Sequence, residues 1–286
     1  MPLALDDSPP PVPLSRSPWI ALLTRIAEET ELDGSVRVAG ELIAVSRGGC
    51  RLVAATLADA LYARYFRFPA GPNLAVLTPE HRGGGAACVR LADALRPQFL
   101  GRDGWRFSYR TEAGVPVFVV TAGDLGSRAT ASCFLDLAPS IAPEVFGRLV
   151  TALDGYDLGF RAELRGDPSI PDRIGSVVVT VARTDLAALA RVALRLRQRS
   201  PFVFGRSVPA FTRHLAPGIA IADEPGNGTD FGRHRCRVVA DGLVAARPGA
   251  GATQRRAAVL RALADACLDP AALHLNPGNP EFRLDR

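Results

Sequence analysis

Arginine and histidine gather in two stretches of the C-terminal half of this 286-residue chain. The first stretch reads RSVPAFTRHLAPG and the second reads FGRHRCRVVADGL. Guanidinium groups bind phosphate and carboxylate oxygens through paired hydrogen bonds, and histidine can exchange a proton near neutral pH. These residue types therefore indicate the recognition of an anion. The basic residues of the two stretches are Arg206, Arg213, His214, Arg233, His234, Arg235 and Arg237.

The second stretch begins a helix that we predict over residues 232–246. Cations at a helix N-terminus oppose the helix macrodipole. A bound anion would offset this effect, because free backbone N–H groups and guanidinium groups would converge on it. The alternative is that these arginines pair with acidic neighbours such as Asp223, Glu224 and Asp230. The local sequence leaves both interpretations open.

Several classes of site are excluded by what the chain lacks. All 34 basic residues are arginine, so a lysine Schiff base, a lysine general base and a P-loop lysine are excluded. No GxSxG, HExxH or dinucleotide-binding motif is present, and the run Gly83–Gly85 is predicted to be a loop. The four histidines (His81, His214, His234 and His274) are far apart, and none of the five cysteines forms a CxxC pair. We therefore expect neither a metal nor a cofactor.

The overall composition is that of a globular protein, with 48% hydrophobic and 22% charged residues. The net charge of +5 is compatible with an anionic partner or substrate. No secretory signal and no apolar run of membrane-spanning length occur, so we expect a cytoplasmic protein that does not contact membranes. No RNA-binding motif supports a nucleic-acid partner.

The hydrophobic periodicity alternates between helical and strand-like segments. We predict a proline-rich disordered tail over residues 1–17, an N-terminal helical region with a hairpin over 18–124, and an α+β domain over 125–286. The run SVVVTVA is rich in β-branched residues and predicts an interior strand over Val177–Val181. The fold class that follows is α+β, with a mixed or antiparallel sheet and helices packed on it. Helices are predicted over residues 19–29, 52–66, 142–153, 185–199, 232–246 and 253–267, a hairpin over 104–121, and a loop-rich stretch over 201–230.

Two further patterns concern single faces of these elements. The segment LGFRAEL alternates, which places Arg161 and Glu163 on the same face of a strand. In the helix that ends near Arg199, Arg191, Arg195 and Arg199 follow one stripe, which we interpret as a solvated face.

Several longer blocks resemble the Hop-A effector-like family, which is named after a type III secretion effector of plant pathogens. They are VPAFTRHLAPGIAIADEPGNGTDFGRHRCRVVADGLV and the tail LDPAALHLNPGNPEFRL, with weaker likeness in GFRAELRGDPSIPDR and in LADALYARYFRFP. The resemblance covers mainly residues 125–286. The chain departs from the family where a lysine is usual: Glu163 stands at one such position and Arg213 at another.

The resemblance implies the modification of a ribosomally synthesised peptide (RiPP biosynthesis). Family relatives stand beside phosphotransferase-like kinases in clusters for class V lanthipeptides and thioamitides. The implied activity is that of a lyase, a carbon–oxygen lyase that eliminates phosphate from phosphorylated Ser or Thr of the precursor peptide, which completes its dehydration. The implied partners are the kinase, contacted through the N-terminal region, and the precursor peptide with its leader.

This chemistry assigns roles to the residues singled out above. Phosphate clamps are expected at Arg161, Arg206, Arg213, Arg235 and Arg237, and proton donors at His214 and His234. Glu163 is the candidate base if burial raises its pKa toward neutrality, and a histidine is the candidate otherwise. These residues would then line one concavity, with Arg161, Arg206, Arg213, His214, His234 and Arg235 pointing into it.

Two alternatives to the lyase remain at this point. Because the family lysines are absent, the chain could be a non-catalytic subunit that binds the phosphopeptide or the leader in a kinase complex. A general anion-binding protein, suggested by the net charge alone, is the third hypothesis.

Overall fold

The residues that a computed structural model describes make up the greater part of the chain. The tail over 1–16, the glycine run Gly83–Gly85 and most of the segment before the hairpin lie outside them. The described residues are 17–32, 35–45, 50–67, 95, 104–112, 115–126, 129–138, 141–165, 177–226 and 228–284.

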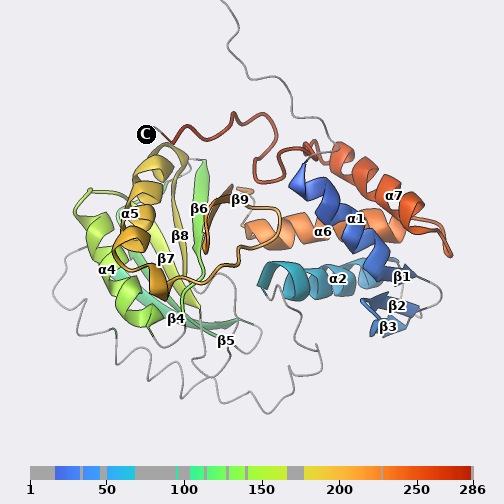
Figure 1. The fold of residues 1–286 in the computed structure, drawn as a ribbon, viewed down its shortest axis with the longest axis horizontal. Coiled ribbons are helices and arrows are strands. Elements are labelled where there is room, and N and C mark those ends of the chain that lie inside the picture. The colour runs from blue at the N-terminus through green and yellow to red at the C-terminus, as the bar shows by residue number, and fades with distance from the viewer. Residues whose placement is uncertain are drawn as a thin grey trace, which may run out of the picture.

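A seven-stranded antiparallel sheet forms the centre of the described structure (Figure 1). Its strand order is β4-β5-β7-β8-β6-β10-β9, and every described pairing is antiparallel. This confirms the predicted α+β class. In chain order the strands are β4 (Trp105–Glu112), β5 (Val115–Ala122), β6 (Thr130–Leu135), β7 (Phe160–Arg165), β8 (Val177–Ala182), β9 (Arg213–Ala216) and β10 (Ile219–Asp223).

One face of the sheet is covered by α4 (Ala142–Asp154) and α5 (Leu186–Arg199), which lie together on one side of it in Figure 1. Alternate residues of each strand point to opposite faces. On this face, apolar side chains such as Phe160, Val179 and Ile221 pack with Phe146 of α4 into one buried cluster. The short 3₁₀ turns Arg183–Asp185 and Pro201–Val203 precede and follow α5.

Helices from the N-terminal part and from the C-terminal part of the chain gather on the other side of the sheet (Figure 1). A second buried cluster joins them to the sheet, and its centre is Phe66 packed edge-on against Phe134 of β6 and tilted against Phe231 of α6. The elements of this layer are α1 (Pro18–Glu29), α2 (Cys50–Leu61), the π-helical turn η2 (Tyr62–Arg67), α6 (Phe231–Ala245) and α7 (Ala252–Asp265). A small sheet, β1 (Thr30–Leu32), β2 (Ser35–Val38) and β3 (Glu41–Val45), lies beside them.

Helices α6 and α7 approach each other closely at Gly242. A Cβ atom placed on Gly242 would lie 2.6 Å from the Cα atom of Val259 in α7. The absence of a side chain at this position therefore permits the observed packing of the two helices.

The C-terminal tail after α7 is held against the sheet by two buried polar groups. Asp223, fully buried at the end of β10, accepts hydrogen bonds from the Arg183 side chain, the Asn276 backbone and the Asn279 side chain. Arg235 of α6 donates to the carbonyl oxygens of Leu273 and Leu275. These contacts hold residues 266–284 in place although they form no helix or strand.

Most predicted elements are confirmed at closely similar bounds, including the hairpin of β4 and β5 and the interior strand β8 between β7 and β6. Arg191, Arg195 and Arg199 are exposed, as predicted. The prediction for residues 201–230 was wrong in part, because β9 and β10 lie within it. The sheet also extends across residue 125, since β4 and β5 pair with β7. The residues before that position therefore contribute strands to the same sheet as those after it.

Candidate functional site

A polar cluster occupies the face of the sheet opposite α4 and α5. The alternation of β7 places Phe160, Ala162 and Leu164 in the apolar core and directs Arg161 and Glu163 to the other face. Arg165 follows on the same face by the same period. Strand β4 contributes Arg110, because Arg110 pairs with Val117 of β5 and Val117 pairs with Arg165.

Three arginines share the carboxylate of Glu163. Arg110 Nη2 lies 2.8 Å and Arg161 Nη2 lies 2.7 Å from Glu163 Oε1. Arg165 donates through Nε at 2.9 Å and Nη2 at 2.7 Å to Glu163 Oε2. Among these side chains, one carboxylate therefore faces three guanidinium groups. We call Arg110, Arg161, Glu163 and Arg165 the arginine cluster.

Exposure differs sharply within the arginine cluster. The side chains of Glu163 and Arg165 are 8% and 9% exposed, whereas those of Arg110 and Arg161 are each 41% exposed. The Nε atom of Arg161 is buried and has no hydrogen-bond partner among the described residues. The inner ion pair therefore supports two outer guanidinium groups that solvent and a ligand can reach.

The condition under which Glu163 would be a base is not met. Burial by itself raises the pKa of Glu163, but the charges of Arg165, Arg161 and Arg110, together with the Arg165 hydrogen bonds, outweigh it and hold the pKa below its usual value. The pKa of Glu163 therefore does not rise toward neutrality. The geometry instead gives Glu163 the task of orienting the arginines. The prediction that Arg161 and Glu163 share a face is confirmed by their ion pair.

The arginine cluster is connected to the helical layer through Tyr62. Arg165 Nη1 donates to the Tyr62 hydroxyl at 3.3 Å, and this hydroxyl lies 3.5 Å from Asp230 Oδ2 at the start of α6. Arg233 lies over the Tyr62 ring, 4.8 Å from its centroid. The tyrosine thus joins the sheet and α6 through polar contacts as well as packing.

The start of α6 is occupied by carboxylates of the chain itself. Asp230 is the N-cap and accepts from the backbone N–H of Arg233, while Glu224 accepts from the backbone N–H of Phe231. The Arg233 side chain pairs with Asp59 and Asp230. Of the two interpretations of this helix start, pairing with acidic neighbours is therefore the one that the structure shows. A free anion site formed by its backbone N–H groups was the wrong interpretation.

The remaining predicted clamps and proton donors do not join the arginine cluster. Arg213 and His214 lie on β9, the strand at the opposite end of the sheet order from β4. Arg213 pairs with Ile221, whose side chain belongs to the core on the face of α4 and α5, and its guanidinium binds Glu281. His214 is exposed. Arg206 lies exposed in the loop before β9.

The α6 candidates serve other contacts. Arg235 is 1% exposed and donates to tail carbonyl groups, and burial lowers its pKa to about 10. His234 Nδ1 accepts from Arg235 Nη1 at 2.7 Å, and burial followed by the Arg235 charge lowers the pKa of His234. Arg237 pairs with Asp241 one turn along the helix. The predicted convergence of all these groups in one concavity was therefore wrong. Arg161 joins Glu163 in the arginine cluster, whereas His234 and Arg235 contact each other on α6.

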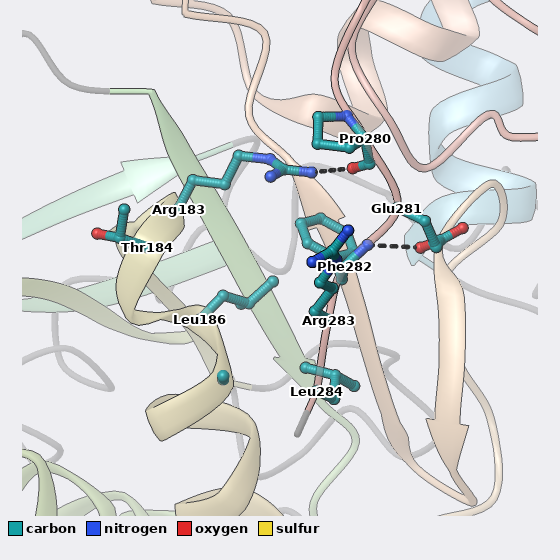
Figure 2. Close-up of a pocket in the computed structure, with 9 residues that line it drawn as sticks. Arg183, Thr184, Leu186, Pro280, Glu281, Phe282, Arg283 and Leu284 are labelled. Atoms are coloured by element: carbon teal, nitrogen blue, oxygen red, sulfur yellow. Dashed lines mark hydrogen bonds between the residues drawn. The ribbon is translucent and has the colours of Figure 1, made fainter. Parts of the chain in front are cut away.

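A cavity of about 250 Å³ lies elsewhere, between the start of α5 and the C-terminal tail (Figure 2). Arg183 lines it, but its guanidinium donates to Asp223 and to the Pro280 carbonyl and lies 4.7 Å from the centroid of the Phe282 ring. No predicted clamp or proton donor lines this cavity.

Sequence reasoning missed Arg110, Arg165 and Tyr62. The alternation of GWRFSYR indicated that Arg110 lies on one face of its strand, but its distance to β7 depends on strand order. Tyr62 belongs to an aromatic group that packs in the core, and only its hydroxyl reaches the cluster.

A comparison with family models matches residues 107–275 to the HopA1 effector protein family. The match covers more than half of the chain. The chain belongs to this family. The HopA1 match begins within β4, so it includes most of the hairpin, and it covers residues 125–275 of the region 125–286 over which the resemblance was expected. All four residues of the arginine cluster lie inside the matched segment.

Two solved effector structures are similar to this HopA1-family chain. The effector protein from Pseudomonas syringae pv. syringae strain 61 has a TM-score of 0.52 and 11% identity, with 80% of this chain and 97% of that chain covered. The effector protein from Pseudomonas syringae pv. tomato strain DC3000 has a TM-score of 0.50 and 12% identity, with the same coverage. At these identities the likeness establishes a shared fold. The curated proteins contain no match to the chain.

Neither a metal-binding cluster nor a membrane-spanning helix occurs among the described residues. Within them, no cluster of three or more His, Cys, Asp or Glu side chains is arranged to bind a metal ion. In the same part of the chain, every helix is too short or too polar to cross a lipid bilayer.

Proposed function

We propose that this HopA1-family protein binds a phosphorylated Ser or Thr residue of a peptide at the arginine cluster and eliminates its phosphate. The observation that carries the proposal is the convergence of Arg110, Arg161 and Arg165 on Glu163, with the Arg110 and Arg161 side chains each 41% exposed. A phosphate dianion is the complementary ligand for such a site.

The outer arginines supply the binding energy in this proposal. Arg161 is held by Glu163 through Nη2, and its Nε has no hydrogen-bond partner among the described residues, so N–H groups of this guanidinium are available for phosphate oxygens. Hydrogen bonds to charged groups contribute about 1.5–3 kcal/mol each. Two such contacts favour phosphoserine over serine by a large factor, since serine offers no charge at this position.

The reaction requires partners that supply the phosphorylated residue. A separate phosphotransferase-like kinase phosphorylates the precursor peptide, and this chain then converts phosphoserine or phosphothreonine to dehydroalanine or dehydrobutyrine. Transfer of the peptide is favoured if the kinase and the lyase form a complex, because the effective concentration of the phosphopeptide then rises. Co-purification of the chain with a kinase encoded beside it tests this partnership, and failure to associate would refute it.

One observation favours the second candidate function, a phosphopeptide-binding subunit without activity. The carboxylate of Glu163 is occupied by three arginines and its pKa is lowered, so it is a poor base. The decisive difference between the two functions is whether phosphate leaves the bound peptide.

The experiment combines binding and turnover on a synthetic phosphoserine peptide. Mass spectrometry distinguishes elimination, which removes phosphoric acid, from hydrolysis, which restores serine, and a thiol added to the reaction traps the dehydroalanine. Fluorescence anisotropy measures binding of the phosphorylated and unphosphorylated forms. We expect Arg161→Ala to weaken binding of the phosphorylated form. Arg191→Ala, an exposed arginine on α5, is the matched control for charge and should bind normally.

The outcomes separate the hypotheses. Elimination by the wild-type protein supports the lyase. Binding without elimination identifies the binding subunit. Equal affinity for the phosphorylated and unphosphorylated peptides, or normal binding by Arg161→Ala, would refute the arginine cluster as the phosphate site.

A further inference from the structure

A second carboxylate lies over the same face of the sheet as the arginine cluster. Glu224 follows β10, and its side chain extends to Ser132 of β6 and to the first turn of α6. Ser132 Oγ donates to Glu224 Oε1, and the Phe231 backbone N–H donates to Glu224 Oε2 at 3.1 Å. Both carboxylate oxygens are therefore held in position, on a residue of intermediate exposure.

A row of paired residues connects Glu224 to the arginine cluster. Arg161 of β7 pairs with Thr180 of β8, and Thr180 pairs with Ser132 of β6. The hydroxyls of Ser132 and Thr180 lie 2.8 Å apart. Because neighbouring strands are about 4.8 Å apart, the backbones of Arg161 and Ser132 are separated by roughly 10 Å. The two groups therefore lie on one face of the sheet, so that a phosphorylated residue bound with its phosphate at the arginines would direct its Cα toward Glu224.

The surroundings of Glu224 suit a group that accepts a proton. Burial is the main cause that raises its pKa to about 6, and the nearby charge of Asp230 acts in the same direction. The Ser132 and Phe231 hydrogen bonds and the charge of Arg165 act in the opposite direction. Arg235 of α6 also faces Glu224, and their charges interact. A carboxylate in this range is ionised at neutral pH and is a stronger base than an ordinary glutamate.

We propose that Glu224 is the proton acceptor of the elimination at this site. The inference rests on the proposed function. Glu224 takes the proton from Cα of the phosphorylated residue, and the electrons of the broken Cα–H bond form the Cα=Cβ double bond. The Cβ–O bond breaks, and its electron pair leaves with the phosphate, which the arginine cluster holds. The products are a dehydroamino acid, free phosphate and a protonated Glu224, so no oxidant or cofactor is required.

Glu224→Gln is the direct test, because the replacement preserves the shape of the side chain. Its amide can accept from the Phe231 N–H and donate to Ser132 Oγ, but it cannot take the proton. We expect elimination from the synthetic phosphoserine peptide to fall by about 100-fold or more, since general bases contribute about 10²–10⁴. Binding of the peptide should persist. Glu144→Gln, an exposed carboxylate on α4, is the matched control and should leave the rate unchanged.

Ser132→Ala provides a readout that a structural role of Glu224 would not change. The Ser132 hydrogen bond lowers the pKa of Glu224, so its loss should raise that pKa. The rate of wild-type elimination should rise with pH around about 6 as Glu224 ionises. In Ser132→Ala the acidic limb of the pH–rate profile, in which the rate rises with pH, should move to higher pH. The maximal rate above this limb should be largely retained.

The results distinguish a failure of this inference from a failure of the proposed function. If the wild-type protein eliminates phosphate and Glu224→Gln does so equally well, Glu224 is not the base and the lyase assignment stands. If the acidic limb does not move in Ser132→Ala, the limb does not report Glu224 and the inference is refuted. If the wild-type protein binds the phosphoserine peptide but leaves it intact at every pH, both proposals are wrong.

Discussion

Glu163→Gln tests whether the arginine cluster is organised around a single carboxylate. The replacement leaves one acceptor oxygen where the carboxylate had two, and it places an amide donor against guanidinium groups. Removing one member of a buried ion pair costs about 3–5 kcal/mol. Arg110 and Arg161 are each 41% exposed and regain contact with water, so the full penalty applies only to Arg165. We therefore expect a loss near the lower limit, about 3 kcal/mol in the free energy of unfolding.

The assay is thermal unfolding of both proteins with and without inorganic phosphate. For a chain of this size a loss of about 1 kcal/mol lowers Tm by about 2–4 °C, so Tm should fall by roughly 6–12 °C. Phosphate should restore more stability to Glu163→Gln than to the wild-type protein, because the anion replaces the missing charge. Ligand at about 100 times its Kd adds about 2.7 kcal/mol.

The matched control is Glu144→Gln, which breaks an exposed pair with Arg148 one turn away on α4. Such pairs contribute about 0.3–0.5 kcal/mol. A loss in Glu163→Gln no larger than in this control would refute the reasoning. An equal gain from phosphate in both proteins would show that the anion binds elsewhere.

Three further predictions concern other parts of the structure. The pKa of Glu224 is raised to about 6 in the native state, above its unfolded value of about 4.3. Between about pH 4.3 and pH 6 the native state therefore binds more protons than the unfolded state. The free energy of unfolding of the wild-type protein should fall as the pH rises through this range. Because Gln does not titrate, the free energy of unfolding of Glu224→Gln, measured with urea, should rise relative to the wild type by up to about 2 kcal/mol between about pH 4 and pH 7.5. A difference between the two proteins that stays the same over this pH range would contradict the raised pKa. Arg235→Met should release the tail carbonyls of Leu273 and Leu275 and cost about 3 kcal/mol or more, seen as faster hydrogen exchange over residues 266–284. Gly242→Ala should push α6 away from α7 and lower the free energy of unfolding by about 1–3 kcal/mol, measured by calorimetry. If the variant is as stable as the wild-type protein, the two helices can move apart without cost and the close packing at Gly242 is not required.

Local periodicity determined which face of its own element a residue occupies. It predicted that Arg161 and Glu163 share a face, that Val177–Val181 is an interior strand, and that an α+β fold results, and the structure confirms all three. The absence of lysine and the sequence blocks that resemble the HopA1 family could likewise be recognised from the amino-acid sequence alone.

Tertiary structure decided which of these faces meet. Arg110 reaches Glu163 because β5 lies between β4 and β7, whereas Arg213 is distant because β9 ends the sheet beyond β10. Strand order depends on pairings between residues far apart in the chain, and periodicity within one segment carries no information about them. For the same reason Arg235, predicted as a clamp, instead supports the tail, and Glu224, read only as an ion-pair partner, lies over the face of the arginine cluster.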